Sequence, residues 1–306
     1  MRPTLFHGRS HGRLLADNPH VPFYVAGFAD VDATDAAGLI SYLDLCTRIS
    51  VERKRAGYRD QGIAPGMHVL DAGCGTGDDL RAIAELVGPL GRAVGVDASR
   101  AMIAEARKRG LPSNAQALQA SADALPFPNA TFDVCRADRL FQHLPAPDAA
   151  ARELRRVLKP GGNLMLLDQD WETVEIRGGD PALTAAIVGA FAAALANGSA
   201  GRHHRSLLER AGFCDVRVTA SATRAPFATA YALMLSSAVE CAKAAGVIDS
   251  DGGNAWISTL LAANRRGEFS YGVTISVAHG STPARSASWH LGSRRASPSP
   301  TPRPRA

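Results

Sequence analysis

The stretch VLDAGCGTGDD, residues 69–79, decides how this chain can fold. It follows a short apolar run and leads into DDLRAIAELV, 78–87, whose apolar residues have helical spacing. The sequence therefore predicts a strand, a tight turn and a helix. Gly73, Gly75 and Gly77 let the backbone turn sharply and bring bare peptide groups close to a ligand. A turn of this kind indicates a binding site for a nucleotide-like molecule.

Two carboxylates at the end of the turn restrict which nucleotide can bind there. The dinucleotide pattern G-x-G-x-x-G requires a glycine where this chain has Asp78, and Asp79 follows it. Their charge would repel a pyrophosphate, which normally binds at a helix N-terminus. A phosphate-binding loop is excluded because no G-K-[ST] follows. The turn favours S-adenosylmethionine, which carries a sulfonium and an amino group and no phosphate.

Apolar runs and amphipathic helices alternate outward from this turn, which predicts a doubly wound α/β fold. Five runs predict parallel strands: 67–72, 93–98, 115–122, 131–137 and 163–171. Two later runs, 214–222 and 268–278, also read as strands because they are rich in β-branched residues. The fold expected is a single catalytic domain over 34–280.

The remaining segments predict an arm, a cap and a tail. Residues 1–33 have no firm periodicity and predict a loose N-terminal arm. Helical spacing over 34–58 and 229–266 predicts extra helices that cap the carboxyl edge of the sheet. Residues 281–306 are rich in Ser, Pro and Arg, which predicts a disordered tail.

Composition excludes several partners. The net charge is +5, and residues 281–306 hold five arginines and no acid, so the body is neutral and a nucleic-acid surface is not expected. The longest apolar run, 183–196, is shorter than the roughly 20 residues that cross a membrane. The five cysteines form no C-x-x-C pair, so we expect no metal site. With no signal peptide apparent, the predicted location is cytoplasmic.

Two further carboxylates fit an adenosine site. Asp97 lies 20 residues after Gly77, at the end of the second predicted strand, where it can accept hydrogen bonds from both ribose hydroxyls. A helix N-cap is the alternative role for Asp97. Asp123 follows the third strand, where its carboxylate and the next backbone amide can contact the adenine edge.

Four runs in order and spacing resemble the class I S-adenosylmethionine-dependent methyltransferases, closest to the ubiquinone and menaquinone biosynthesis type: VLDAGCGTGDD, GVDAS (95–99), ADALPFPNATFDV (122–134) and LKPGG (158–162). The resemblance covers roughly residues 60–170. It implies a mostly parallel, Rossmann-like sheet of seven strands whose last strand is antiparallel.

The resemblance also assigns the cofactor-binding residues. Asp71 and the turn from Gly73 to Gly77 would hold the methionine part and Asp97 the ribose. Ala98 and Met102 would contact the adenine face, and Asp123 with Ala124 the adenine edge. The run CRADR, 135–139, departs from the family's usual apolar or Ser-containing stretch, and Arg136 is included among the expected cofactor contacts.

Methyl transfer from a sulfonium is an in-line displacement with a neutral leaving group, so holding the reactants in place is the main requirement. Where the acceptor must lose a proton, His143 is the candidate general base, with a pKa near 6.5 or somewhat shifted from it. A core or helix-start histidine is the alternative. Asp168, Asp170 and Glu172 end the fifth strand and could orient an amine or hydroxyl, or could be ordinary loop residues.

The expected activity is methyl transfer to a small, hydrophobic metabolite, because capping helices enclose such acceptors. The N/D-P-P-Y/F run that grips planar amines in related enzymes is missing. An NAD(P)-dependent oxidoreductase and a non-catalytic cofactor-binding protein of the same fold stay open, as does a homodimer.

Overall fold

The computed structural model describes residues 36–284 of the 306. The expected arm, 1–33, and nearly all of the expected tail lie outside this range. Within it, no helix is long and apolar enough to cross a membrane.

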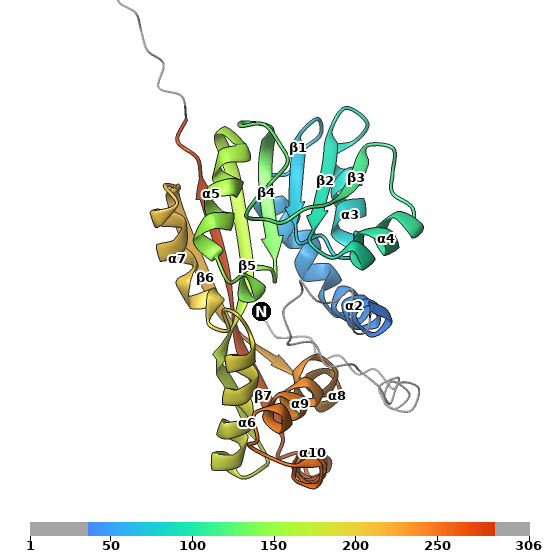
Figure 1. Ribbon diagram of the computed structural model, residues 1–306, viewed down its shortest axis with the longest axis vertical. Helices are drawn as coiled ribbons and strands as arrows, with labels where there is room; N and C mark the ends of the chain where they lie inside the picture. The colour runs from blue at the N-terminus through green and yellow to red at the C-terminus, as the bar shows by residue number, and fades with distance from the viewer. Residues whose placement is uncertain (1–35, 285–306) are drawn as a thin grey trace, which may run out of the picture.

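A seven-stranded sheet in the order β3-β2-β1-β4-β5-β7-β6 forms the centre of the molecule (Figure 1). Its strands are β1 His68–Ala72, β2 Arg92–Asp97, β3 Ala115–Gln119, β4 Phe132–Asp138, β5 Leu158–Arg177, β6 Cys214–Ala225 and β7 Ser270–Ser281. The first five are mutually parallel, whereas β7 is antiparallel to both β5 and β6. The predicted fold, including its antiparallel last strand, is confirmed.

Helices cover both faces of the sheet because side chains alternate along its buried strands. On one face, Val69 packs with α3 (Asp78–Val87) and α4 (Arg100–Lys108). On the other, Leu70 packs with α5 (Pro147–Val157) and α7 (Ala200–Arg210). The first described helix, α2 (Ala36–Asp60), contacts α3 and α4 near the carboxyl ends of the strands (Figure 1).

A second lobe extends below these carboxyl ends, where β5, β7 and β6 continue past the other four strands (Figure 1). It contains α6 Pro181–Ala194, α8 Phe227–Ala230, the π-helical turn η3 Tyr231–Leu235, α9 Ser236–Ala244 and α10 Ser250–Arg265. Its core includes Trp171, Phe191, Met234 and Trp256. The helices expected over 229–266 are present, and α6 joins them in this lobe.

The ordered domain continues past the boundary expected at residue 280. Ser281 ends β7, opposite Asn163 of β5. The Thr282 hydroxyl is buried, donates to the carbonyl of Lys159 at 2.6 Å and accepts from the amide of Gly162 at 3.0 Å. Placing the tail's start at 281 was therefore wrong. The polar composition of these residues does not reveal their hydrogen bonds to Lys159 and Gly162 at the start of β5.

Candidate active site

The glycine turn after β1 is tied to the end of β2. Gly73, Gly75 and Gly77 all have positive φ, at 74°, 51° and 75°. The amide of Gly75 donates to Asp97 Oδ2 at 2.9 Å, and the amide of Ser99 donates to Asp97 Oδ1 at 2.9 Å. The helix N-cap is Ser99, whose Oγ accepts from the amide of Met102. The N-cap alternative for Asp97 is therefore wrong, and its carboxylate fixes the turn instead.

A cavity of about 420 Å³ opens at this edge of the sheet. Eight of the predicted site residues line it: Asp71, Gly73, Gly75, Asp97, Ala98, Met102, Asp123 and His143. They come from β1, from β2 and from the segments after β1, β2, β3 and β4, so the fold brings together most of the expected site.

Three predicted cofactor contacts do not line the cavity. Gly77 lies at the start of α3, where a side chain would meet Ala106 Cβ at 3.1 Å. Ala124 is exposed and its amide donates to the carbonyl of Ser121. Arg136 is 1% exposed, beneath the cavity floor. Its expected role in direct cofactor contact is wrong, because β4 directs this side chain into the protein interior.

Arg136 instead neutralises buried carboxylates. Its Nη1 donates to Asp71 Oδ1 and to Asp79 Oδ2, each at 2.7 Å, and Nη2 lies 3.3 Å from Asp138 Oδ2. The guanidinium also lies over the ring of Tyr58, 5.4 Å from its centroid. Since isolated buried charges are costly, these groups stabilise the fold only together.

Asp71 and Asp79 share Arg136 but ionise differently. Asp79 Oδ1 also accepts from Lys54 Nζ at 2.7 Å and from Tyr58 Oη at 2.8 Å. Burial alone would raise the pKa of Asp79, but Arg136 and Lys54 outweigh it and hold that pKa below its usual range. For Asp71, burial dominates over Arg136 and raises the pKa to about 7. Asp71 therefore titrates near neutral pH at the floor of the cavity.

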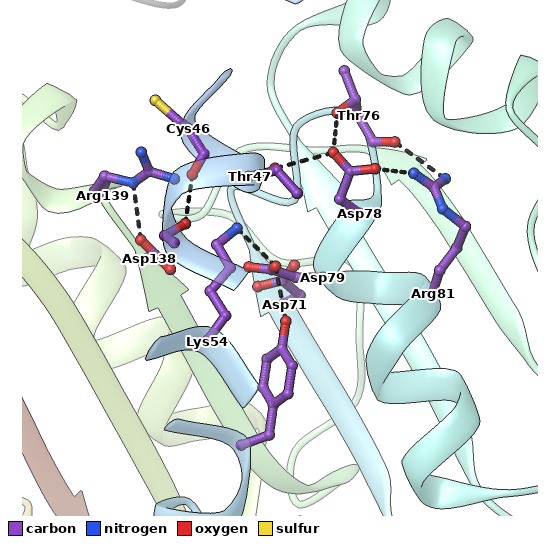
Figure 2. Close-up of polar contacts among 12 residues, drawn as sticks. Cys46, Thr47, Lys54, Asp71, Thr76, Asp78, Asp79, Arg81, Asp138 and Arg139 are labelled. Carbon is purple, nitrogen blue, oxygen red and sulfur yellow. Dashed lines mark hydrogen bonds and ion pairs between the residues drawn. The ribbon is translucent and has the colours of Figure 1, made fainter. Parts of the chain in front are cut away.

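The carboxylates of the turn are matched by cations, as Figure 2 shows. Arg81 donates to Asp78, and Arg109 lies 3.8 Å from the same carboxylate. Lys54 reaches Asp79. The turn is therefore less negative than its sequence indicates, and the charge argument against a pyrophosphate is weaker than expected.

Sequence reasoning missed the residues that α2 contributes to the site. Leu43, Thr47 and Lys54 line the cavity, and the Thr47 hydroxyl donates to Asp78 Oδ2 at 3.2 Å. These positions are four and seven residues apart, so they share one helix face. That spacing was the available signal, but only tertiary structure shows what this face meets.

The opposite part of the cavity is mostly apolar. Side chains from the segment after β4, from β5 and from the second lobe form this wall: Leu140, Leu144, Trp171, Phe191, Leu195 and Leu233. Asp138, Arg139, Gln142, His143 and Ser237 are its polar members. The cavity thus joins a polar half beside the glycine turn to an apolar half beneath the cap.

Hydrogen bonds fix the state of His143. The Trp171 indole N–H donates to Gln142 Oε1 at 2.8 Å, so the Gln142 amide nitrogen, 2.9 Å from His143 Nε2, must donate to it. His143 Nε2 is therefore an unprotonated acceptor. Burial and the charge of Arg139 lower the pKa of His143 to about 3. The pKa near 6.5 expected for a general base is wrong, since desolvation disfavours the imidazolium.

The three acids expected at the end of the fifth strand lie within β5, which continues to Arg177, and they stabilise structure. Asp168 is fully buried, accepts from the Gln142 amide at 3.2 Å and lies 3.0 Å from His204 Nε2. Asp170 and Glu172 both accept from Arg202. None of these three acids lines the cavity. Among the described residues, no group of three or more His, Cys, Asp or Glu could hold a metal ion.

Comparison with known proteins decides the family. Residues 69–162 match the family described as a methyltransferase domain. The ubiquinone/menaquinone biosynthesis C-methyltransferase UbiE of Shewanella oneidensis is 40% identical over 119 residues, which are 38% of this chain and 47% of that protein. The chain belongs to the class I S-adenosylmethionine-dependent methyltransferases. This methyltransferase spans about half the length of the UbiE proteins that it matches.

Other relatives and solved structures are similar to this chain over more of its length. An uncharacterised 37.1 kDa protein in transposon TN4556 of Streptomyces fradiae is 34% identical over 245 residues, 78% of this chain and 70% of that protein. Among solved structures, a putative methyltransferase from Bacillus halodurans has a TM-score of 0.53 at 16% identity, over 76% of this chain and 99% of that one. Phosphoethanolamine N-methyltransferase 2 of Haemonchus contortus has a TM-score of 0.54 at 16% identity, over 86% and 61%. These structures share the fold of this methyltransferase.

The residues at the turn fit the family's cofactor, S-adenosylmethionine. The two cavity-lining glycines expose backbone without a Cβ, and a side chain at Gly73 would meet Leu140 at 3.1 Å and one at Gly75 would meet Leu43 at 3.3 Å. The carboxylates of Asp71 and Asp97 face the same space. These carboxylate acceptors suit a ligand that donates hydrogen bonds from an amine and from ribose hydroxyls.

Proposed function

We propose that this methyltransferase transfers the methyl group of S-adenosylmethionine to a small, hydrophobic metabolite by in-line displacement. The observation that carries the proposal is the single cavity with two unlike halves, one beside the glycine turn and one apolar. Its volume of about 420 Å³ lies in the range of small-molecule sites. A polymer substrate would not be expected to enter so small a chamber.

Each part of the cofactor has a proposed binding residue. Asp97 would accept hydrogen bonds from the ribose, and Asp123 would contact the adenine edge. Met102 and Ala98 would pack on the adenine face. Asp71, at the cavity floor, would attract the amino group of the methionine part, and Lys54 would attract its carboxylate. The bound cofactor supplies an activated methyl group on a positively charged sulfur.

The protein's own contribution to the reaction is positioning and exclusion of water. The apolar wall holds the acceptor against the polar half, which raises the effective concentration of the two reactants. A histidine with a pKa of about 3 is a weak base at neutral pH. We therefore propose that His143 contacts the acceptor as a neutral polar group, and that no general base is needed.

The proposal is tested by giving the protein S-adenosylmethionine labelled in the methyl group, together with an extract of its source organism. Mass spectrometry then identifies what gains the label. We expect label in the small-molecule fraction, and less of it when Asp97→Ala replaces the wild type at a limiting concentration of S-adenosylmethionine. Label confined to protein or nucleic acid would refute the proposed acceptor class.

A further inference from the structure

Arg139 occupies a strained position at the wall of the cavity. Its φ of 60° is in the left-handed region, which is unfavourable for a residue other than glycine. The backbone amide donates to the carbonyl of Leu167 at 2.6 Å, so β5 holds this conformation in place. Strain that the surrounding structure maintains tends to occur where a side chain must be aimed at a ligand.

The guanidinium of Arg139 is largely removed from water. Its side chain is 16% exposed, and its Nε donates to Asp138 Oδ1 at 3.0 Å. Figure 2 shows it reaching toward α2 beside Cys46. The Cys46 thiol and the Tyr42 hydroxyl are the other groups that act on it. The contact through Nε leaves the planar end of the guanidinium beside neutral groups.

The charge of Arg139 acts on other groups at the wall of the cavity. Asp138 pairs with both Arg139 and Arg136, and Arg136 also pairs with Asp71 and Asp79. Burial and the positive charge of Arg139 lower the pKa of His143. The charge of Arg139 therefore acts inside the apolar half of the cavity.

We propose that the acceptor is an apolar molecule that carries a carboxylate, and that Arg139 is the residue that recognises this group. This inference rests on the proposed function, and it names the acceptor's chemical class. A carboxylate presents two coplanar oxygens that match the end of a guanidinium. The apolar wall of Trp171, Phe191 and Leu233 suits the body of such an acid. A carboxylate on the acceptor would add a second anionic partner to this largely buried guanidinium, beside Asp138.

Binding of a matched pair of probes tests this inference without turnover. Calorimetry measures 2-naphthoate and 2-naphthamide, which share a shape and differ in charge, on protein saturated with S-adenosylhomocysteine. On the wild type we expect the acid to bind at least tenfold more tightly than the amide. In Arg139→Gln the acid should lose at least tenfold in affinity and the amide less than threefold. Arg139→Lys, which keeps the charge, should retain part of the preference.

Arg202→Gln is the matched control, because Arg202 also pairs with acids, Asp170 and Glu172 of β5, but does not line the cavity. It should leave both affinities unchanged. Equal binding of acid and amide to the wild type, or no binding of either, would overturn the inference, as would an acid preference that survives in Arg139→Gln. The wild-type comparison decides the question even if that variant does not fold. Failure of S-adenosylhomocysteine to bind the wild type would count against the proposed function itself.

Discussion

Replacing Arg136 by methionine tests whether the buried cluster beneath the cavity stabilises this fold. The change removes the cation that lies 2.7 Å from both Asp71 and Asp79, and keeps a long apolar side chain that can fill the space. Breaking one side of a buried ion pair typically costs about 3–5 kcal/mol, because a charge is left without compensation. In a domain of this size that loss corresponds to a fall in Tm of about 6–20 °C.

The loss should depend on pH in a defined direction. Without Arg136, burial and mutual repulsion raise the folded-state pKa of Asp71 still further, so the folded variant binds a proton that the unfolded chain releases. Stability of the variant then falls as pH rises from 5.5 to 8, and the deficit relative to the wild type is larger at pH 8.

Circular dichroism melts at both pH values measure this effect. Arg210→Met is the control, because that residue pairs with Asp148 at the surface and salt and water screen the pair. It should leave Tm nearly unchanged. Equal losses in the two variants, or an Arg136→Met deficit that is the same at pH 5.5 and 8, would refute the reasoning.

Three further predictions follow from the site and the domain boundary. Affinity for S-adenosylmethionine should rise with pH through about 7, because Asp71 must ionise to attract the amino group. Calorimetry should find that this pH dependence is lost in Asp71→Asn. A wild-type affinity that does not change with pH would exclude Asp71 from that contact. His143→Ala should slow single-turnover methyl transfer less than about tenfold, and the wild-type rate should show no titration near pH 6.5. A loss of rate of about 10²–10⁴-fold would instead show that His143 acts as a general base. Truncation after residue 280 should lower Tm because it removes the Thr282 hydrogen bonds, and truncation after residue 284 should not; equal melts would show that Thr282 contributes nothing.

Local patterns predicted most of the fold. The strand and helix around 69–87 and the strand over 268–278 follow from the alternation and spacing of apolar residues, which depend on near neighbours in the chain. The family resemblance added the antiparallel orientation of the last strand. The ends of the elements were less accurate, since the hydroxyl of Thr282 gains its partners from residues about 120 positions earlier.

The charges of the site were the hardest feature to predict. Arg81, three residues after Asp78, could be matched to it by helical spacing. Arg136 pairs with Asp71 across 65 residues, and Lys54 with Asp79 across 25, so their pairing depends on how the sheet and α2 assemble. The sequence therefore made the turn look more negative than it is, because these cations could not be assigned to it. Likewise, the low pKa of His143 comes from burial, which the sequence around that residue does not reveal.

The account depends most on the claim that Asp97 and the glycine turn hold S-adenosylmethionine. Calorimetric titration of wild type and Asp97→Ala with S-adenosylmethionine, and of wild type with NAD, tests it most directly. We predict one site for S-adenosylmethionine, no binding of NAD, and a loss of roughly 1–3 kcal/mol in Asp97→Ala, because charge-assisted hydrogen bonds to the ribose and the support of the Gly75 amide are removed. Unchanged affinity in Asp97→Ala, or binding of NAD in place of S-adenosylmethionine, would contradict the account.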